Sequence, residues 1–276
     1  MSSTDPNEEE KQKEAIKNTF NTVANAYGTG ACRFFHISGQ TMADLHKLDG
    51  NENILDVASG TGAATIPLSK KLPNGNVTAV DFSPAMLEQA KIYAHREKQE
   101  NIDFQIHDMT RLPFSAAQFD HANCAFGLFF VDDIGGLLNH IGEKIKPGGR
   151  MIVSGFCGQS FLPQSDLTLD SLQKYGVKVP EQRYRWRRMS EPGQLFELFE
   201  SAGFKDVSIH RKSLGYYISP ESWWEVLWNA GFRGLLAQLN ENLEKFKQEH
   251  IEQVRSLADD KGLWLEIDVN FTTGYK

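Results

Sequence analysis

Two glycines and an aspartate stand at the ends of successive apolar runs, where they could hold a ligand that contains a ribose. Gly60 and Gly62 follow the run that begins at Asn53. Because glycine has no Cβ, the backbone there can turn sharply and a ligand can approach the main chain, next to the free amides of the following helix. Asp81 ends the next run about twenty positions later, where its carboxylate can accept both hydrogen bonds from a ribose diol.

Each of these signals also has a purely structural reading. Glycine turns serve strand–helix packing about as often as they bind a ligand, and an aspartate at a strand end often caps a helix. Here Ser83 and Pro84 already have the pattern of a helix N-cap and first turn,. Asp81 is therefore available for another role, which favours the ligand-binding interpretation.

The segments that position these residues alternate between two periodicities. Short, nearly continuous apolar runs predict buried parallel strands, and apolar residues at helical spacing predict the helices between them. The predicted strands are 54–57, 77–80, 102–107, 119–126 and 150–155, and the predicted helices are 63–71, 84–98 and 134–145. Because strands that alternate with helices form crossover units, we predict a doubly wound α/β sheet.

Further helices are predicted on both sides of this core. Residues 1–13 are polar and acidic and are expected to be a flexible N-terminus. The remaining predictions are helices at 14–27, 32–48 and 194–202, an extended segment at 205–218, helices within 220–257 and a strand at 263–271, while 156–190 has no clear period. We interpret residues 14–276 as a single domain with a helical cap inserted at about 220–260,.

Composition narrows the class of protein and of partner. The chain has 276 residues, 40% of them hydrophobic, and a net charge of −7, so no general positive field would attract nucleic acid or an anionic membrane. Its three cysteines cannot all pair, which favours a reduced, cytoplasmic setting. No apolar stretch is long enough for a membrane span, and the N-terminus lacks the apolar region of a secretory signal,. We expect a small-molecule partner and no metal site.

Several motifs, in order and correctly spaced, resemble the class I S-adenosylmethionine-dependent methyltransferases, and most closely the ubiquinone and menaquinone biosynthesis methyltransferases. The matching stretches cover nearly the first two-thirds of the chain and are 20–27, 54–62, 80–87, Asp108 with 112–114, 126–128 and 145–150. The resemblance implies S-adenosylmethionine as cofactor. It also implies a Rossmann-like sheet of about seven strands with the last antiparallel, N-terminal helices at 14–48 and a donor-binding core at 49–156.

The resemblance assigns roles to individual residues. Asp81 would hold the ribose, Asp108 would accept from the adenine amino group, and Asp56 would help to fix the ammonium of the methionine part. Tyr27, on the first helix, would close over that part. By resemblance the full set of donor-binding residues is Tyr27, Asp56, Ala58, Gly60, Gly62, Asp81, Phe82, Met86, Asp108, Met109, Ala125 and Phe126.

Two histidines depart from the pattern of the family. His107 stands where relatives often carry a glycine or another small residue, so packing on the adenine side is expected to differ. His121 occupies a strand position that is usually apolar. We interpret His121 as a hydrogen-bonded structural residue.

The sequence identifies no catalytic base. Methyl transfer from a sulfonium is an in-line displacement that depends mainly on a dry, prealigned site, so a base is optional. The candidates are His36, His140, Tyr27, Asp132 and Asp133,. His36 and Asp132 are retained as catalytic candidates, although a lone helical histidine is more often structural. At least one of the two aspartates is expected to cap the helix that begins near residue 134.

Two aromatic-rich segments could contact the methyl acceptor. The basic run Arg183–Arg188 could recognise a phosphate, a carboxylate or a stacked ring, but a solvated loop is the favoured reading,. Trp223, Trp224, Trp228, Phe232 and Leu236 could line an acceptor pocket or equally pack a helical core,. We expect a small hydrophobic or aromatic acceptor, methylated on carbon or oxygen, and leave the oligomeric state open.

Two other functions compete with this interpretation. The glycine motif of nicotinamide-dependent oxidoreductases has a third small residue three positions after the second glycine. In this sequence Thr65 stands at that position. A non-catalytic S-adenosylmethionine-binding or protein-interaction module would keep the fold and could use residues 244–257 as an interaction helix. The complete donor motif argues against this second alternative.

Overall fold

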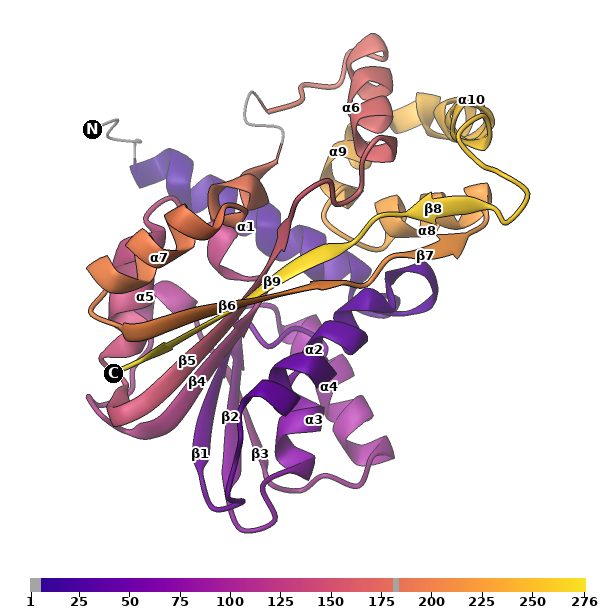
Figure 1. Ribbon diagram of the computed structural model, residues 1–276. Helices are drawn as coiled ribbons and strands as arrows, with labels where there is room; N and C mark the ends of the chain where they lie inside the picture. The colour runs from indigo at the N-terminus through magenta and orange to yellow at the C-terminus, as the bar shows by residue number, and fades with distance from the viewer. Residues whose placement is uncertain (1–5, 181–183) are drawn as a thin grey trace.

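A seven-stranded sheet forms the centre of the protein (Figure 1). The computed structural model describes residues 6–180 and 184–276, with side chains from residue 10 onward. The strands lie in the order β3-β2-β1-β4-β5-β9-β6. Their bounds are β1 Asn53–Val57, β2 Asn76–Asp81, β3 Ile102–Ile106, β4 Phe119–Ala125, β5 Ile145–Cys157, β6 Lys205–Ser213 and β9 Asp268–Tyr275. Because β1 to β5 pair in parallel and β9 pairs antiparallel with β5 and β6, the predicted doubly wound sheet with an antiparallel last strand is confirmed.

Helices cover both faces of this sheet, as its apolar strands require. In β1, Ile54, Leu55 and Val57 are all completely buried, which is typical of a parallel strand covered on both sides. In Figure 1, α2 (Phe34–Leu45), α3 (Thr65–Lys70) and α4 (Pro84–Arg96) lie on one side of the sheet. The other side carries α5 (Ile134–Gly142) and α7 (Pro192–Ser201).

The first helix begins earlier than the sequence predicted. α1 spans Pro6–Val23, whereas the prediction began it at Glu14 and assigned residues 1–13 to a flexible N-terminus. Pro6 suits the first helical position, and the sequence after it is acidic, a composition that is favoured at the positive end of a helix dipole,. The polar composition of the segment is therefore that of a helix start, and residues 1–5 lie outside the described part of the chain.

The helical cap is built from two separate stretches of chain rather than one. Besides the predicted stretch, which forms α8 (Pro220–Trp228), α9 (Arg233–Leu236) and α10 (Leu243–Arg255), it contains α6 (Gln164–Lys174). The buried Trp223 indole donates a hydrogen bond to Thr168 Oγ1 at 3.2 Å, and the same hydroxyl lies 2.9 Å from His250 Nε2. Trp223 is therefore part of the core of the cap, which favours the packing interpretation of this tryptophan.

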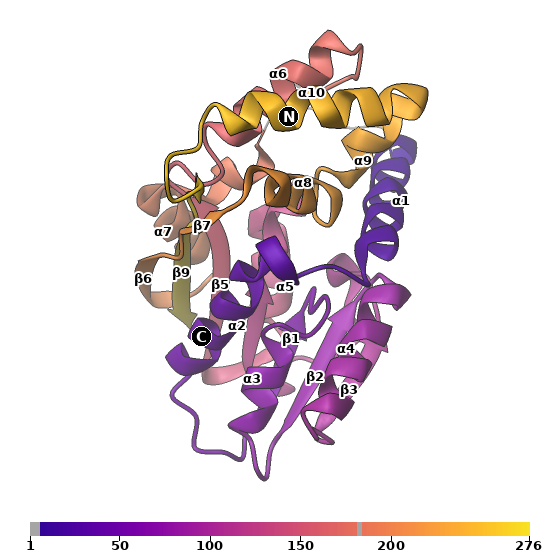
Figure 2. The ribbon, with the colours of Figure 1, turned by 90° about the vertical axis from the view of Figure 1, so that its right-hand side faces the viewer.

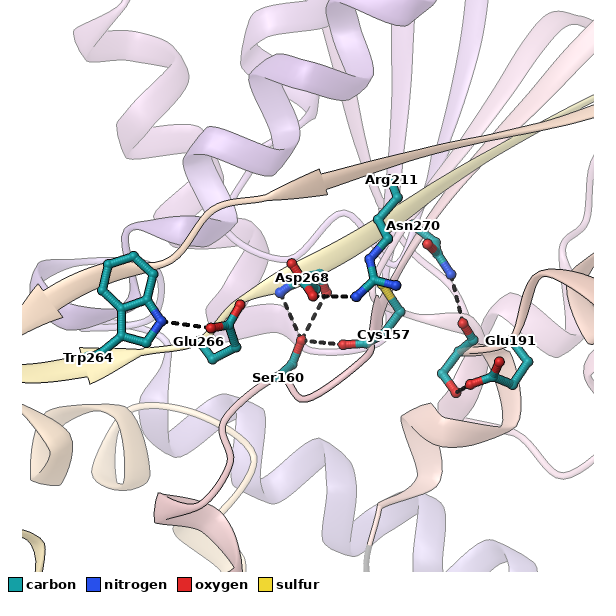
Figure 3. Close-up of polar contacts among 9 residues, drawn as sticks. Cys157, Ser160, Glu191, Arg211, Trp264, Glu266, Asp268 and Asn270 are labelled. Atoms are coloured by element: carbon teal, nitrogen blue, oxygen red, sulfur yellow. Dashed lines mark hydrogen bonds and ion pairs between the residues drawn. The ribbon is translucent and has the colours of Figure 1, made fainter. Parts of the chain in front are cut away.

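The cap is joined to the sheet by two short strands, which connect to one end of the sheet. β7 (Tyr216–Ile218) follows β6 and pairs with β8 (Leu263–Leu265), which precedes β9. At the junction, Ser160 Oγ donates to the Cys157 carbonyl at 2.7 Å and accepts from the Asp268 amide at 2.9 Å. Arg211 forms an ion pair with Asp268 beside it (Figure 3). These contacts fix the base of the cap to β5, β6 and β9.

No helix within residues 6–180 and 184–276 is long and apolar enough to cross a membrane.

Candidate active site

A cavity of about 970 Å³, part of it open to solvent, lies at the carboxyl ends of the central strands. β1 pairs with β2 on one side and with β4 on the other, so chain order reverses beside β1. Such a switch point leaves a crevice in which ligands of open α/β sheets bind. The cavity is lined by Tyr27, Ala58, Gly60, Asp81, Phe82, Met86, Asp108, Met109, Ala125 and Phe126, which are the predicted donor-binding residues apart from Asp56 and Gly62.

The glycine loop presents bare backbone to this cavity. Gly60 has a φ of +54°, and a Cβ built on it would meet no other atom of the structure within 4 Å. Its amide donates a hydrogen bond to Asp81 Oδ2 at 2.9 Å. The open space above Gly60 fits a ligand that lies directly on the main chain, as the donor-binding interpretation requires.

Two strand ends beside the cavity carry backbone strain. Ala58 after β1 and Phe126 after β4 have φ values of 53° and 54°, a conformation that costs residues other than glycine on the order of 1–3 kcal/mol. The Phe126 amide donates to the Ser154 carbonyl of β5 at 3.0 Å, which holds this turn in place. Strained residues cluster at functional sites, and both of these line the cavity.

Asp81 lines the cavity and is almost fully buried, with 7% of its surface exposed. Its Oδ1 accepts from the Ser83 amide and its Oδ2 from the Gly60 amide, both at 2.9 Å. Ser83 caps α4, since its hydroxyl accepts from the Met86 amide at 3.2 Å, as the sequence predicted. Burial outweighs these hydrogen bonds and raises the pKa of Asp81 to about 6,.

Donor affinity is expected to depend on the protonation of Asp81. Since its pKa is raised to about 6, the carboxylate is ionised at pH 7.5 and protonated at pH 5, and the protonated form is the poorer hydrogen-bond acceptor for a diol. The affinity for S-adenosylhomocysteine should therefore fall several-fold between pH 7.5 and pH 5, as calorimetric titration can measure. The control is Asp81→Asn, whose affinity should be lower at pH 7.5 and nearly independent of pH. An equally steep pH profile in that variant would assign the effect to another group.

Asp56 and Gly62 lie behind the cavity wall. Asp56 is completely buried, and its carboxylate accepts from Thr65 Oγ1 at 2.5 Å and from Asn123 Nδ2 at 2.9 Å. It therefore braces β1 against α3 and β4, and burial raises its pKa to about 6. A Cβ on Gly62 would contact Ala90 Cβ at 3.4 Å, so this glycine allows close packing on α4.

The end of the cavity beyond β3 is polar. Asp108 Oδ1 accepts from the amide and the hydroxyl of Thr110, both at 2.8 Å, and its Oδ2 lies 3.2 Å from Lys13 Nζ. His107 also lines the cavity, and its Nε2 lies 2.9 Å from Gln105 Oε1. Sequence reasoning missed Lys13 because residues 1–13 carry no apolar pattern that would tie them to a site.

The opposite end of the cavity is aromatic. The Tyr27 ring stacks on Phe35 with centroids 4.5 Å apart, and Phe20 packs edge-on against Phe130 at 5.4 Å. Phe20, Tyr27 and Phe130 line the cavity together with Val131. Burial raises the pKa of Tyr27 well above its ordinary value, so its phenol stays neutral and can donate a hydrogen bond but does not act as a ready base.

Of the candidate bases, Tyr27 and Asp132 are the ones that line the cavity. His36 lies outside the lining and packs edge-on against Tyr93 with centroids 5.4 Å apart. Asp133 caps α5 by accepting from the Gly136 amide at 2.8 Å. His140 and His121 each bind a backbone amide: His140 Nε2 accepts from Leu112 and His121 Nδ1 accepts from Arg150, which confirms the structural interpretation of His121.

The basic run 183–188 holds the loop that follows β4, so its interpretation as a solvated loop was wrong for the described residues. Arg185 donates to the Phe130 carbonyl at 3.2 Å and forms an ion pair with Asp132. Arg188 donates to the Val131 carbonyl at 2.7 Å and to the Asp132 carbonyl. Arg183 lies outside the described residues. Because sequence gives no sign of which distant carbonyls a guanidinium meets, this contact could not be predicted.

Comparisons with known proteins agree with this geometry. Residues 54–149 match a methyltransferase domain family. The chain is 30% identical over 224 residues to the demethylmenaquinone methyltransferase of Lactiplantibacillus plantarum, covering 72% of this chain and 92% of that protein. It is 34% identical over 183 residues to the demethylmenaquinone methyltransferase of Staphylococcus aureus, covering 62% of this chain and 74% of that protein.

Solved structures share the fold at lower sequence identity. A putative methyltransferase from Bacillus halodurans superposes with a TM-score of 0.58 at 16% identity, covering 87% of this chain and 99% of that one. Phosphoethanolamine N-methyltransferase 2 of Haemonchus contortus, in complex with S-adenosyl-L-methionine, superposes with a TM-score of 0.54 at 18% identity. That match covers 87% of this chain and 52% of the other.

Proposed function

Because the chain belongs to the class I S-adenosylmethionine-dependent methyltransferases of the ubiquinone and menaquinone type, we propose that it methylates an apolar aromatic acceptor at the Phe20–Phe130 end of its cavity. The observation that carries this proposal is the contrast between the two ends. Asp81, Asp108 and the bare backbone of Gly60 line the cavity at or after the ends of β1, β2 and β3, and the rings of Phe126 and Phe130 line it after β4, on the other side of β1 in the sheet. A polar donor and a flat apolar acceptor are the ligands that such ends suit.

The residues of the first end fit the donor. In this proposal Asp81 accepts from the ribose, Asp108 accepts from the adenine amino group, and the methionine part lies on the open face of Gly60; all three residues line the cavity. Ala58 and Phe126, which line the cavity and have positive φ values, would lie beside that part. Bound S-adenosylmethionine supplies a methyl group on a positively charged sulfur, and that charge disappears on transfer.

We infer that the acceptor's own chemical groups make its reacting atom nucleophilic. Tyr27 is held as a neutral phenol, and the carboxylate of Asp132 forms an ion pair with Arg185. This favours an acceptor whose own hydroxyl groups donate electron density to a ring carbon, such as a quinol, over an amine or an aliphatic alcohol. The relatives named above are demethylmenaquinone methyltransferases, and this name supports an acceptor of the quinone type for this chain.

The acceptor can be tested directly with purified protein. Demethylmenaquinol incubated with S-adenosylmethionine should gain the mass of one methyl group, whereas a simple phenol and a small primary amine should gain none. Phe130→Ala should raise the KM for the quinol several-fold, because it removes one aromatic wall, and should leave the affinity for S-adenosylhomocysteine unchanged. Methylation of the amine in place of the quinol would refute the proposed acceptor while keeping the enzyme class.

A further inference from the structure

The N-terminal helix is part of the wall of the donor cavity. α1 contacts α4 on one side and α9 of the cap on the other (Figure 2). Asn21 Oδ1 accepts from the Ser83 hydroxyl at 2.7 Å, which fixes the helix next to the cap residue of α4. One face of α1 then supplies four lining residues, Gln12, Lys13, Ile16 and Phe20.

Lys13 is the cationic member of that face. Its ammonium lies 3.2 Å from Asp108 Oδ2 and 3.4 Å from Thr110 Oγ1. The two side chains of the ion pair are partly buried, with 23% of Lys13 and 34% of Asp108 exposed. The ion pair therefore spans from the first helix of the chain to the loop after β3.

We propose that Lys13 is a positioning residue for the adenine end of the donor, acting through the carboxylate of Asp108. The inference rests on the proposed donor orientation and adds to it a residue from outside the glycine and aspartate motifs. Thr110 occupies Oδ1 of Asp108 with two hydrogen bonds. Lys13 orients Oδ2 and leaves it a second lone pair, which is available to the adenine amino group.

Charge supports the same role. Burial raises the pKa of Asp108, but hydrogen bonds from Thr110 and Lys13 and the charge of Lys13 lower it, with a net result below the ordinary value,. Lys13 thus helps to keep Asp108 ionised, and an ionised carboxylate is the stronger acceptor for an amino group. Through the same contact Lys13 holds the N-terminal half of α1 over the cavity.

The test is the affinity for S-adenosylhomocysteine in matched lysine variants, measured by calorimetric titration. Lys13→Met removes the charge and keeps a good helix former, and it should weaken binding about two- to fivefold, as expected for a partly exposed ion pair. Lys13→Arg should restore most of the affinity. Lys11→Met, an exposed change on the same helix, should bind like the wild type.

A double-mutant cycle separates positioning from a general effect on the helix. If Lys13 acts through Asp108, Lys13→Met should cause almost no further loss of affinity for S-adenosylhomocysteine in an Asp108→Asn background. The thermal midpoint of the single variant Lys13→Met should match that of the wild type. Equal affinities of wild type and Lys13→Met, or equal losses in Lys11→Met and Lys13→Met, would overturn the inference. No binding of S-adenosylhomocysteine by the folded wild type would instead overturn the proposed donor site, and this inference with it.

Discussion

A leucine in place of Gly60 is expected to abolish binding of S-adenosylhomocysteine while the protein stays folded. A Cβ at this position meets no other atom within 4 Å, so a larger side chain would project into the cavity without colliding with the rest of the structure. The positive φ of +54° adds strain of about 1–2 kcal/mol for any residue with a Cβ. The expected loss of affinity is more than about a hundredfold, since the side chain would occupy the space of the donor.

Gly148→Leu is the matched control. Gly148 also has a positive φ, +82°, and a Cβ there also meets nothing within 4 Å, but it lies near the start of β5, outside the cavity lining. Both variants should lose a similar free energy of unfolding in a denaturant titration, and Gly60→Leu should lose binding in calorimetry while Gly148→Leu keeps it. Normal binding by Gly60→Leu would mean that the donor does not lie on this loop.

The sheet and the position of the cavity could be predicted because they depend on local patterns. The strands of a sheet buried on both faces are continuous apolar runs, as in β1, where Leu55 and Val57 are fully buried. Once the strands alternate with helices, their carboxyl ends meet at one edge of the sheet. Residues just after those ends, such as Gly60 and Asp81, could therefore be placed near one another from sequence.

The position of a residue along its strand, rather than its membership of the motif, decides whether the residue lines the cavity. Ala58 lies just past the end of β1 and faces the cavity, whereas Asp56 lies two residues earlier, inside the strand, and is enclosed by Thr65 and Asn123. The motif contains both residues, but only the structure shows that Asp56 has protein partners for both carboxylate oxygens. The resemblance alone could not separate a residue that lines the cavity from one that supports it.

Helix α6 could not be predicted because hydroxyl groups share its buried face with apolar side chains. Ser165, Thr168 and Ser171 are buried beside Leu169 and Leu172, so the 3.6-residue period of hydrophobicity is weak. Thr168 is satisfied by the Gln164 carbonyl and by His250 of α10. The buried face of α6 can be recognised only when its contact with His250 of α10 is known.

The contacts of Lys13 and Arg188 were missed for a different reason. Lys13 meets Asp108 across 95 positions of sequence, and Arg188 meets Val131 across 57. An ion pair or a bond to a carbonyl imposes no spacing on the segments around it, so one sequence carries no trace of the pairing. Both contacts border the cavity, where the fold is built from segments far apart in the chain.

Gly39→Ala is expected to be among the most destabilising single-methyl substitutions in the chain. Gly39 lies in α2, and a Cβ there would be 2.0 Å from the Ala63 carbonyl oxygen and 2.8 Å from the Ala64 amide nitrogen. Backbone atoms cannot rotate away, so α2 or the segment that follows the glycine loop must move. We expect the free energy of unfolding to fall by about 2–4 kcal/mol, which would lower the thermal midpoint by roughly 5–10 °C.

Gly193→Ala provides the comparison for that change, because Gly193 is also helical, in α7, and a Cβ there meets nothing within 4 Å. It should leave stability unchanged or raise it by up to about 1 kcal/mol through helix propensity. Gly39→Ala should also weaken binding of S-adenosylhomocysteine, since Ala63 and Ala64 directly continue the loop of Gly60 and Gly62. If Gly39→Ala were as stable as Gly193→Ala, α2 could not be packed against the donor loop as closely as the structure has it. Loss of stability with full retention of binding would mean that α2 moves and the loop does not.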